Sequence, residues 1–263
     1  TKELFCNIDH TFPNHHPDPT VDSNLTDIIN EIKNGDFDLG IAFDGDADRI
    51  VVVDEKGGII RSDILIALFL PEVISETNKK VIFDVKCSES LEKMILKHKG
   101  IPLMWKTGHS LIKDKMKIEK VKFAGEMSGH IFFADDYYGY DDALYVGLRL
   151  LQLLSNTNKT LSQLTEEIPK YFSTPEMRID CLNDKEKFRI TEKAVKYFKD
   201  NFECITIDGV RIKFKNGWGL VRASNTQPVI VCRFESTSNS NLEKIKKIVL
   251  EKLKEFGDIK INE

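Results

Sequence analysis

The sequence lacks any paired-cysteine pattern and any long apolar run. Its five cysteines are odd in number and scattered over 263 residues, and no C-x-x-C pair occurs. This usage argues for a reducing compartment and against a disulfide framework. No apolar stretch of about 18 residues is present, and no signal peptide is visible. We therefore expect a cytoplasmic protein without a transmembrane helix.

An excess of positive charge is also lacking. The 38 Lys and Arg residues are outnumbered by 42 Asp and Glu residues, which gives a formal net charge of −4. Without a basic field a nucleic acid is not an expected partner. Zinc is not expected at the N-terminal end, where Cys6 lies near His10, His15 and His16, because their spacing fits no standard zinc pattern.

Strand-like and helix-like segments alternate as far as residue 170. Short apolar runs with turn residues on both sides predict strands, and apolar residues at helical spacing predict helices. The predicted strands are 4–8, 38–43, 50–54, 81–85, 102–105, 121–124 and 131–133. The predicted helices are 22–33, 62–77 with Ser62 as N-cap, Ser88 to near Gly100, one from Ser110, and 141–154 with an apolar face of Leu144, Tyr145, Leu148 and Leu151. The alternation implies a mostly parallel sheet flanked by helices.

The pattern changes around residues 169–175. A strand at 177–181 and a helix at 186–199 are followed by four strand-like pieces, at 204–207, 210–214, 219–223 and 229–234, and by an amphipathic C-terminal helix. This order predicts a small α+β domain. The fold class is therefore α/β, with mixed or parallel sheets flanked by helices. The expected division is the C-terminal part of an α/β domain (1–58), a second α/β domain (59–170) and the α+β domain (171–263).

An acidic loop stands between two of the predicted strands. Asp44, Asp46 and Asp48 alternate along it, and three carboxylates this close repel one another unless a cation compensates. Oxygen ligands favour Mg²⁺ or Ca²⁺ over zinc. An EF-hand is excluded, because its sixth position requires Gly and here holds Arg49. Arg49 can hold a phosphate or neutralise an adjacent carboxylate, as phosphoryl transfer requires.

Two histidine-bearing loops, residues 106–110 and 125–130, follow predicted strands. Ligands of open α/β sheets bind outside the carboxyl ends of strands. His109 and His130 can carry protons near neutral pH, and Lys86 ends another strand at that edge. We therefore expect a ligand site there. Three lysines of the following helix are interpreted as a solvated basic face: Lys113, Lys115 and Lys117.

Side chains suited to a sugar phosphate occur in two loops. Glu126 and Ser128 can bind vicinal sugar hydroxyls as acceptor and donor. The segment Arg222–Pro228 offers a guanidinium, two hydroxyls and an amide, with backbone N–H groups as further donors. Such a set suits a non-reacting phosphate. Ser224 is not expected to be a nucleophile, because nothing near it in sequence resembles a general base.

Three loops in this order resemble those of the α-D-phosphohexomutase superfamily: Asp44–Arg49, Gly125–His130 and Arg222–Thr226. In that family they are the metal loop, the sugar-specificity loop and the phosphate-binding loop. Three further segments are similar to the phosphomannomutase/phosphoglucomutase branch: 84–87, 105–110 and 217–219. The resemblance covers essentially the whole chain.

The resemblance implies an enzyme that interconverts hexose 1-phosphates and 6-phosphates through an enzyme phosphoserine and a bisphosphorylated sugar. The three aspartates would hold Mg²⁺ beside that serine. Lys86, His109 and His130 would contact substrate and assist proton transfer. Glu126 and Ser128 would read the sugar hydroxyls. The distal phosphate would be bound by Arg222, Ser224, Asn225 and Thr226.

Met127 bears on the substrate. The glucosamine branch usually has Gln at this position, so the analogy favours mannose or glucose phosphates. Three alternatives remain open: a phosphoglucosamine mutase, a Mg²⁺-dependent sugar phosphatase with a loop aspartate as nucleophile, and a non-catalytic sugar-phosphate-binding module.

The family's nucleophilic serine lies in a loop of the Thr-x-Ser-His-Asn-Pro type, which has no counterpart here. The segment Thr20–Asn24 lacks the His and the Pro, and the chain starts at Thr1. We therefore expect an N-terminally truncated mutase whose partner is the missing N-terminal domain. Alone, it is expected to be inactive and to bind metal weakly or not at all, because the phosphoserine completes the metal site in the family.

Overall fold

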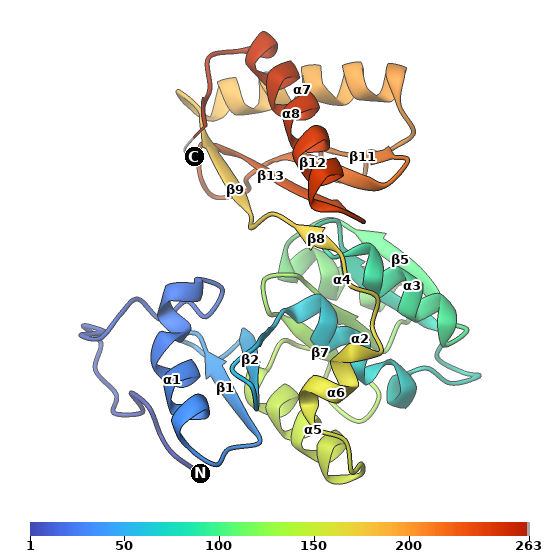
Figure 1. Ribbon diagram of the computed structural model, residues 1–263. Helices are drawn as coiled ribbons and strands as arrows, with labels where there is room; N and C mark the ends of the chain where they lie inside the picture. The colour runs from blue at the N-terminus through green and yellow to red at the C-terminus, as the bar shows by residue number, and fades with distance from the viewer. Residues whose placement is uncertain (262–263) are drawn as a thin grey trace. The chain divides into compact units, whose positions relative to one another are not determined.

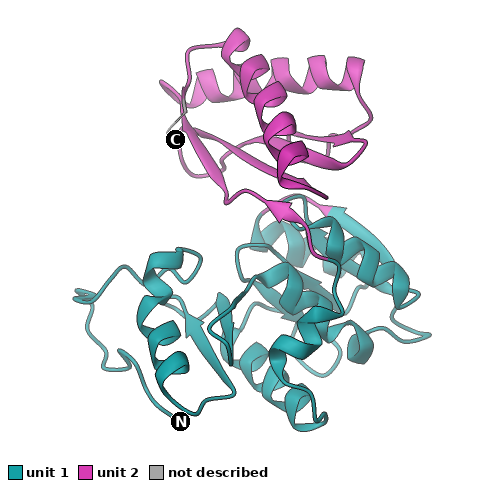
Figure 2. Cartoon of the chain, in the orientation of Figure 1, with its two compact units in different colours: residues 1–104, 108–169 teal, residues 105–107, 170–263 magenta. Residues whose placement is uncertain are grey.

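The computed structural model of the protein describes residues 1–261 and divides into two compact units (Figure 1). Unit 1 comprises residues 1–104 and 108–169, and unit 2 comprises residues 105–107 and the chain from Lys170 onward (Figure 2). Each unit has its own cluster of buried apolar side chains. Each is therefore described by itself.

The first sheet of unit 1 is antiparallel throughout, with the strand order β1-β2-β3. Its strands are β1 (Leu39–Phe43), β2 (Ile50–Asp54) and β3 (Ile59–Ile60). The 3₁₀ helix η1 (Asp22–Leu25) leads into α1 (Thr26–Asn34), which packs on β1 and β2. All residues of β2 are buried. Because β2 pairs with β1, the two strands together fix both ends of the loop between them.

The strand expected at residues 4–8 is wrong. No strand occurs among residues 1–21, Phe5 has a positive φ of 56°, and Ile8 is fully exposed. A short apolar run forms a strand only where a neighbouring strand accepts its hydrogen bonds and a core covers its side chains.

The second sheet of unit 1 has the order β5-β4-β6-β7. Its strands are β4 (Lys80–Asp84), β5 (Ile101–Trp105), β6 (Phe123–Gly125) and β7 (Ile131–Phe133). β4 and β6 are parallel and β6 and β7 are antiparallel, so the sheet is mixed. The helices of unit 1 that accompany it are α2 (Ser62–Val73), α3 (Glu89–Lys97), α4 (His109–Glu119), α5 (Ala143–Ser155) and α6 (Leu161–Glu166).

Helix α2 is buried over most of its length and places Phe69 edge-on against Phe123 and Phe133. It begins at Ser62 after Arg61, so Ser62 is its first residue and not its N-cap. It ends at Val73, short of the expected residue 77, because the chain then becomes extended and makes an isolated bridge (Ser75 to Asn78).

The apolar face of α5 differs from the expected one. Its buried residues are Ala143, Val146, Gly147 and Leu150, whereas Leu144, Leu148 and Leu151 are 57%, 65% and 46% exposed. The space beside Gly147 is bounded by Ile41, Ile50 and Phe43. Small residues let the helix approach the first sheet closely, and this close packing outweighs the burial of the larger leucines.

Unit 2 contains an antiparallel sheet of order β10-β11-β12-β13-β9-β14, with β8 also pairing with β13. Its strands are β8 (Phe172–Ser173), β9 (Met177–Asp180), β10 (Cys204–Ile205), β11 (Val210–Phe214), β12 (Gly217–Ala223), β13 (Val229–Ser236) and β14 (Lys260–Ile261). Helices α7 (Asp184–Asn201) and α8 (Asn239–Phe256) contact each other and the central strands, and Figure 1 shows both on one face. The expected fold class, with mixed sheets and a C-terminal α+β part, is confirmed. Among the described residues, no helix combines the length and apolar character that crossing a bilayer requires.

Candidate functional site

The acidic loop closes the hairpin between β1 and β2, whose last pair is Phe43 with Ile50. Its turn depends on Ala47, which has φ 57° and donates its N–H to the Asp44 carbonyl at 3.2 Å. The hairpin brings one carboxylate oxygen each from Asp44, Asp46 and Asp48 within 4.8 Å of one another. Asp44 is buried and Asp46 is exposed. The loop thus presents three oxygen ligands at one place, which fits a hard divalent cation.

Arg49 neutralises the buried aspartate of this loop. Its Nε lies 2.6 Å from Asp44 Oδ2, and the backbone N–H groups of Asp48 and Arg49 donate to Asp44 Oδ1 at 3.1 and 3.0 Å. Burial alone would raise the pKa of Asp44, but the hydrogen bonds from Arg49 outweigh it and the pKa is lowered. Burial and the neighbouring Asp44 raise the pKa of Asp48. Of the two predicted uses of Arg49, the structure shows neutralisation of a carboxylate.

A second cluster surrounds Asp141, just before α5. Its Oδ2 lies 2.9 Å from His109 Nδ1 and 3.0 Å from His130 Nδ1, and its Oδ1 accepts from Lys113 Nζ at 2.8 Å. The two imidazole rings stack with centroids 5.2 Å apart. His130 Nδ1 also lies 3.6 Å from Asp48 Oδ1, so this cluster borders the acidic loop.

Of the two contacts to Asp141 Oδ2, the one from His109 has hydrogen-bond geometry. His130 Nδ1 is buried and has no hydrogen-bond partner among the described residues. Burial opposes protonation of His130, but Asp141 and the nearby carboxylates outweigh it and raise the pKa of the ring. Burial likewise opposes the charge on Asp141, but His130 and Lys113 hold its pKa well below the usual range.

The Gly125–His130 loop contains a buried carboxyl group, Glu126, which is 1% exposed. Its Oε1 accepts the N–H of Gly108, the residue before α4, at 2.6 Å. Burial, and then the charge of Asp84, raise the pKa of Glu126 to about 7. Asp84 Oδ1 accepts the N–H of Met127 at 3.0 Å, and Lys86 Nζ lies 4.0 Å from Asp84 Oδ2. Buried polar groups thus fix the shape of this loop.

The structure brings the unit 1 candidates together. The N–H of Ile50, directly after the acidic loop, donates to the carbonyl of Gly129 in the Gly125–His130 loop at 3.2 Å. The predicted residues gathered around these two loops are Asp44, Asp46, Asp48, Arg49, Lys86, His109, Glu126, Ser128 and His130.

In unit 2, the loop after β12 is held by its own hydroxyl group. Ser224 Oγ accepts the N–H groups of Thr226 and Gln227, both at 3.3 Å, while Asn225 and Thr226 are exposed. The Arg222 side chain is 5% exposed. Its Nε donates to Asp208 at 2.8 Å, and its Nη2 is buried without a hydrogen-bond partner among the described residues. A buried, unsatisfied guanidinium N–H suits an anion.

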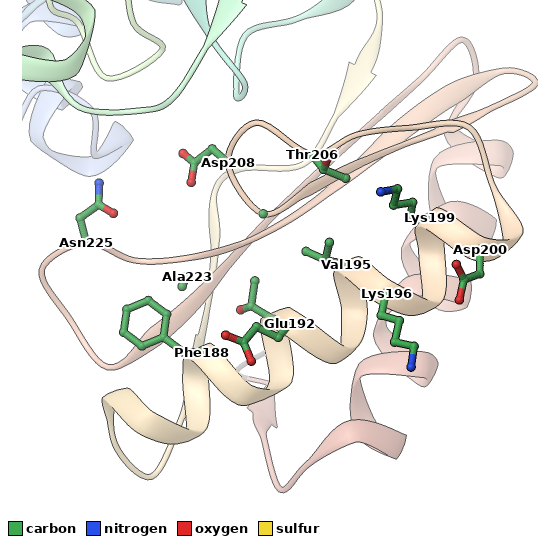
Figure 3. A pocket seen from close by; sticks show the side chains of 12 residues that line it. Phe188, Glu192, Val195, Lys196, Lys199, Asp200, Thr206, Asp208, Ala223 and Asn225 are labelled. Atoms are coloured by element: carbon green, nitrogen blue, oxygen red, sulfur yellow. The ribbon is translucent and has the colours of Figure 1, made fainter. Parts of the chain in front are cut away.

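A groove of about 630 Å³ lies beside this loop, between α7 and the strands of unit 2 (Figure 3). Ala223 and Asn225 border it, and Figure 3 shows Lys199 and Glu192 projecting from α7. Its charged residues are of both signs: Glu192, Lys196, Lys199, Asp200 and Asp208. The groove as a whole is therefore not an anion cradle, which distinguishes it from the surroundings of Arg222.

Two residues of the site were missed by the sequence analysis. Asp141 was predicted only as the start of a helix, because Asp before an apolar helical pattern is an ordinary helix-start signal. Lys113 was assigned to a solvated face, but it pairs with Asp141. Lys115, from the same face, pairs with Glu119 instead.

Three family models match consecutive parts of the chain. They are phosphoglucomutase/phosphomannomutase alpha/beta/alpha domain II over residues 1–58, alpha/beta/alpha domain III over residues 61–172, and the C-terminal domain over residues 176–252. The chain belongs to this family.

Named members of the family are similar over nearly the whole chain. A phosphomannomutase/phosphoglucomutase of Pseudomonas putida is 49% identical over 93% of this chain and 53% of its own length. A phosphoglucomutase of Neisseria gonorrhoeae is 46% identical over 92% of this chain and 53% of its own length. The chain thus spans about half the length of the curated relatives it matches.

The fold matches as well. The crystal structure of a phosphoglucomutase/phosphomannomutase family protein from Burkholderia thailandensis superposes with a TM-score of 0.89 at 42% identity, covering 98% of this chain and 56% of that one. Family membership implies a metal cofactor, and the three aspartates form a group able to hold one.

Proposed function

We propose that this chain is the metal-binding and sugar-phosphate-binding part of a phosphohexomutase that interconverts hexose 1-phosphates and 6-phosphates through an enzyme phosphoserine and a bisphosphorylated sugar. The observation that carries the proposal is the junction in unit 1 of a three-carboxylate loop with a buried carboxyl group and two histidines. The names of relatives at 46–49% identity support it.

The metal in this proposal is Mg²⁺, held by Asp44, Asp46 and Asp48. All three ligands are carboxylates, which suits a hard cation, and Arg49 already balances one of the negative charges. When bound, the cation would neutralise charge on the phosphoryl group during transfer.

The sugar would be read by Glu126 and Ser128. Because Oε1 of Glu126 is committed to the Gly108 N–H, the other oxygen is the one left for a hydroxyl. Lys86, His109 and His130 would contact the substrate and assist proton transfer, and Arg49 would act at the transfer site through the metal loop. Met127 favours mannose or glucose phosphates over glucosamine phosphates, and the relatives' names agree with that preference.

The distal phosphate would be bound in unit 2 by Arg222, Ser224, Asn225 and Thr226. The unsatisfied Nη2 of Arg222 supports this role. A phosphate oxygen would supply the missing acceptor, and the exposed side chains that follow offer further donors.

The three-part division at residues 58/59 and 170/171 is also a proposal, and the family matches that end at residue 58 and run from 61 to 172 support it. We further propose that the parent protein is cytoplasmic, and that the family's N-terminal domain with its phosphoserine is the partner of this chain. By itself the chain would bind sugar phosphates without turning them over.

Calorimetry tests the binding. We expect glucose 1-phosphate and mannose 1-phosphate to bind and glucose not to bind. Arg222→Met should weaken the binding of both sugar phosphates about tenfold, because one charge-assisted hydrogen-bonding group is lost. Arg189, whose side chain is 41% exposed and pairs with Glu186, is a matched control, since Arg189→Met should leave affinity unchanged.

A turnover assay with the same chain separates the alternatives. Release of inorganic phosphate from glucose 1-phosphate in Mg²⁺ would identify a phosphatase and contradict the proposal. Equal affinity for glucose and its phosphate would contradict sugar-phosphate recognition altogether.

A further inference from the structure

One carboxylate, Asp141, faces three basic groups at once. Its side chain is 6% exposed. Oδ2 lies within 3.0 Å of Nδ1 of both His109 and His130, and Oδ1 accepts from Lys113. The three partners come from two elements, because α4 carries His109 and Lys113 whereas His130 directly precedes β7.

The fold fixes where this carboxylate stands. Asp141 makes an isolated β-bridge with Phe132, the residue at the centre of β7. The next residue, Asp142, is the N-cap of α5 and accepts the N–H of Tyr145. Two residues on, the N–H of Ala143 donates to the carbonyl of Ala47 in the acidic loop at 2.9 Å. The backbone at Asp141 and at the two residues that follow it is thus held in place.

The contacts of Asp141 have a chemical consequence for the imidazole rings. In a neutral histidine one ring nitrogen carries the proton and the other is an acceptor, and a hydrogen bond at one nitrogen decides which. A carboxylate beside Nδ1 favours the Nδ1–H form, which leaves Nε2 with its lone pair. Nδ1 of both rings lies within 3.0 Å of the same oxygen, with hydrogen-bond geometry at His109 and a close charge contact at His130, so both would offer Nε2 as an acceptor.

We propose that Asp141 is a positioning residue that holds His109 and His130 as Nδ1–H tautomers and keeps their Nε2 atoms free to accept a hydrogen bond from a ligand hydroxyl. Lys113 holds the other carboxylate oxygen and so fixes the orientation of the group. The ligand is a hexose phosphate, and in this respect the inference rests on the proposed function.

Asp48 is the other carboxylate that faces His130, at 3.6 Å from Nδ1. Asp48 is one of the proposed metal ligands, whereas Asp141 is not. Oδ2 of Asp141 also lies closer to the same nitrogen, at 3.0 Å. The orientation of the ring is therefore assigned to Asp141 rather than to Asp48.

The test is long-range ¹H–¹⁵N NMR of the histidine rings in the full 263-residue chain, at a pH of about 9, well above the usual histidine pKa of about 6.5. In the wild type we expect protonated-type shifts at Nδ1 of both rings. In Asp141→Asn, Lys113 retains the amide oxygen, so the NH₂ group faces Nδ1 and both rings should switch to the Nε2–H form.

Asp142→Asn is the matched control, because it changes the neighbouring carboxylate, which caps α5 and accepts from Tyr137, but touches neither ring. It should leave both tautomers as in the wild type. Unchanged tautomers in Asp141→Asn, or equal changes in both variants, would overturn the inference.

Addition of glucose 1-phosphate separates this inference from the proposed function. We expect it to shift the Nε2 resonances of the wild type. The tautomers could switch in Asp141→Asn while the sugar phosphate leaves the Nε2 resonances of the wild type unchanged. That result would support the positioning of the rings by Asp141 and contradict the proposed contact of these histidines with substrate.

Discussion

The N–H of Ile50 donates to the carbonyl of Gly129 at 3.2 Å, and this bond joins the end of the acidic loop to the Gly125–His130 loop. Gly129 has a φ of 110°, a conformation that L side chains rarely adopt. An added Cβ would lie 3.0 Å from the Ile50 carbonyl oxygen and 3.1 Å from its nitrogen. The position therefore requires glycine for both its conformation and its contacts.

Gly129→Ala should lower the free energy of unfolding by roughly 2–4 kcal/mol, since it adds backbone strain to a steric clash. The control is Gly147→Ala in α5, where the nearest atoms to an added Cβ are 3.5 Å away. There alanine's better helix propensity should make the change neutral or stabilising by up to about 1 kcal/mol. Urea denaturation measures both variants, and equal losses would contradict the contact argument.

Arg49→Met should tighten Mg²⁺ binding about three- to tenfold. The guanidinium occupies Asp44 Oδ2 at 2.6 Å and competes with a cation for that carboxylate. Removing the guanidinium leaves more uncompensated negative charge on the three aspartates, which strengthens the binding of a divalent cation. Calorimetry with Mg²⁺ at low ionic strength measures the change, and Arg61→Met, which loses only an exposed pair with Asp22, is the control. Weaker binding in Arg49→Met would show instead that the arginine builds the site.

Glu126 should make stability depend on pH. Its pKa is about 7 in the folded protein against an ordinary value of 4.5, so between these values the folded state binds more protons than the unfolded state. Stability should therefore fall as pH rises from 4.5 to about 7, by an amount on the order of 1–3 kcal/mol. Thermal unfolding across this range should show a flatter profile for Glu126→Gln. The exposed Glu76 is the control, and a profile unchanged in Glu126→Gln would refute the assignment.

Lys187→Met should weaken phosphate binding by the segment Arg222–Pro228. Lys187 is a buried lysine of α7 whose Nζ donates to the carbonyl of Gln227 at 2.8 Å and so tethers the end of that segment. Losing the tether should reduce affinity for inorganic phosphate about three- to tenfold, as measured by calorimetry. Lys185→Met changes an exposed lysine on the same helix and should have no effect. Equal effects of the two would point to long-range charge alone.

Local pattern was enough to predict most elements of the fold. Alternating apolar runs and turn residues predicted β11 at Val210–Phe214 and β7 at Ile131–Phe133 with their exact bounds. The acidic loop was also predictable, because its three aspartates are neighbours in sequence. Elements and loops whose residues are neighbours in sequence can be predicted from the spacing of those residues.

Features that depend on distant residues were not predictable in this way. The buried face of α5 is set by its contacts with the first sheet, and a pattern of large apolar residues does not contain that information. Asp141 reads locally as the start of a helix, yet it meets His109 across 32 residues of sequence. The raised pKa of Glu126 likewise arises from burial and from Asp84, which lies on another strand.

The most direct test of the central claim is backbone amide NMR during titration of Mg²⁺-containing protein with glucose 1-phosphate. The account predicts saturable shifts at residues 125–130 and 222–226, and no such shifts with glucose. Saturable shifts confined to other parts of the chain, or none at all, would contradict the assignment of these loops to sugar-phosphate recognition.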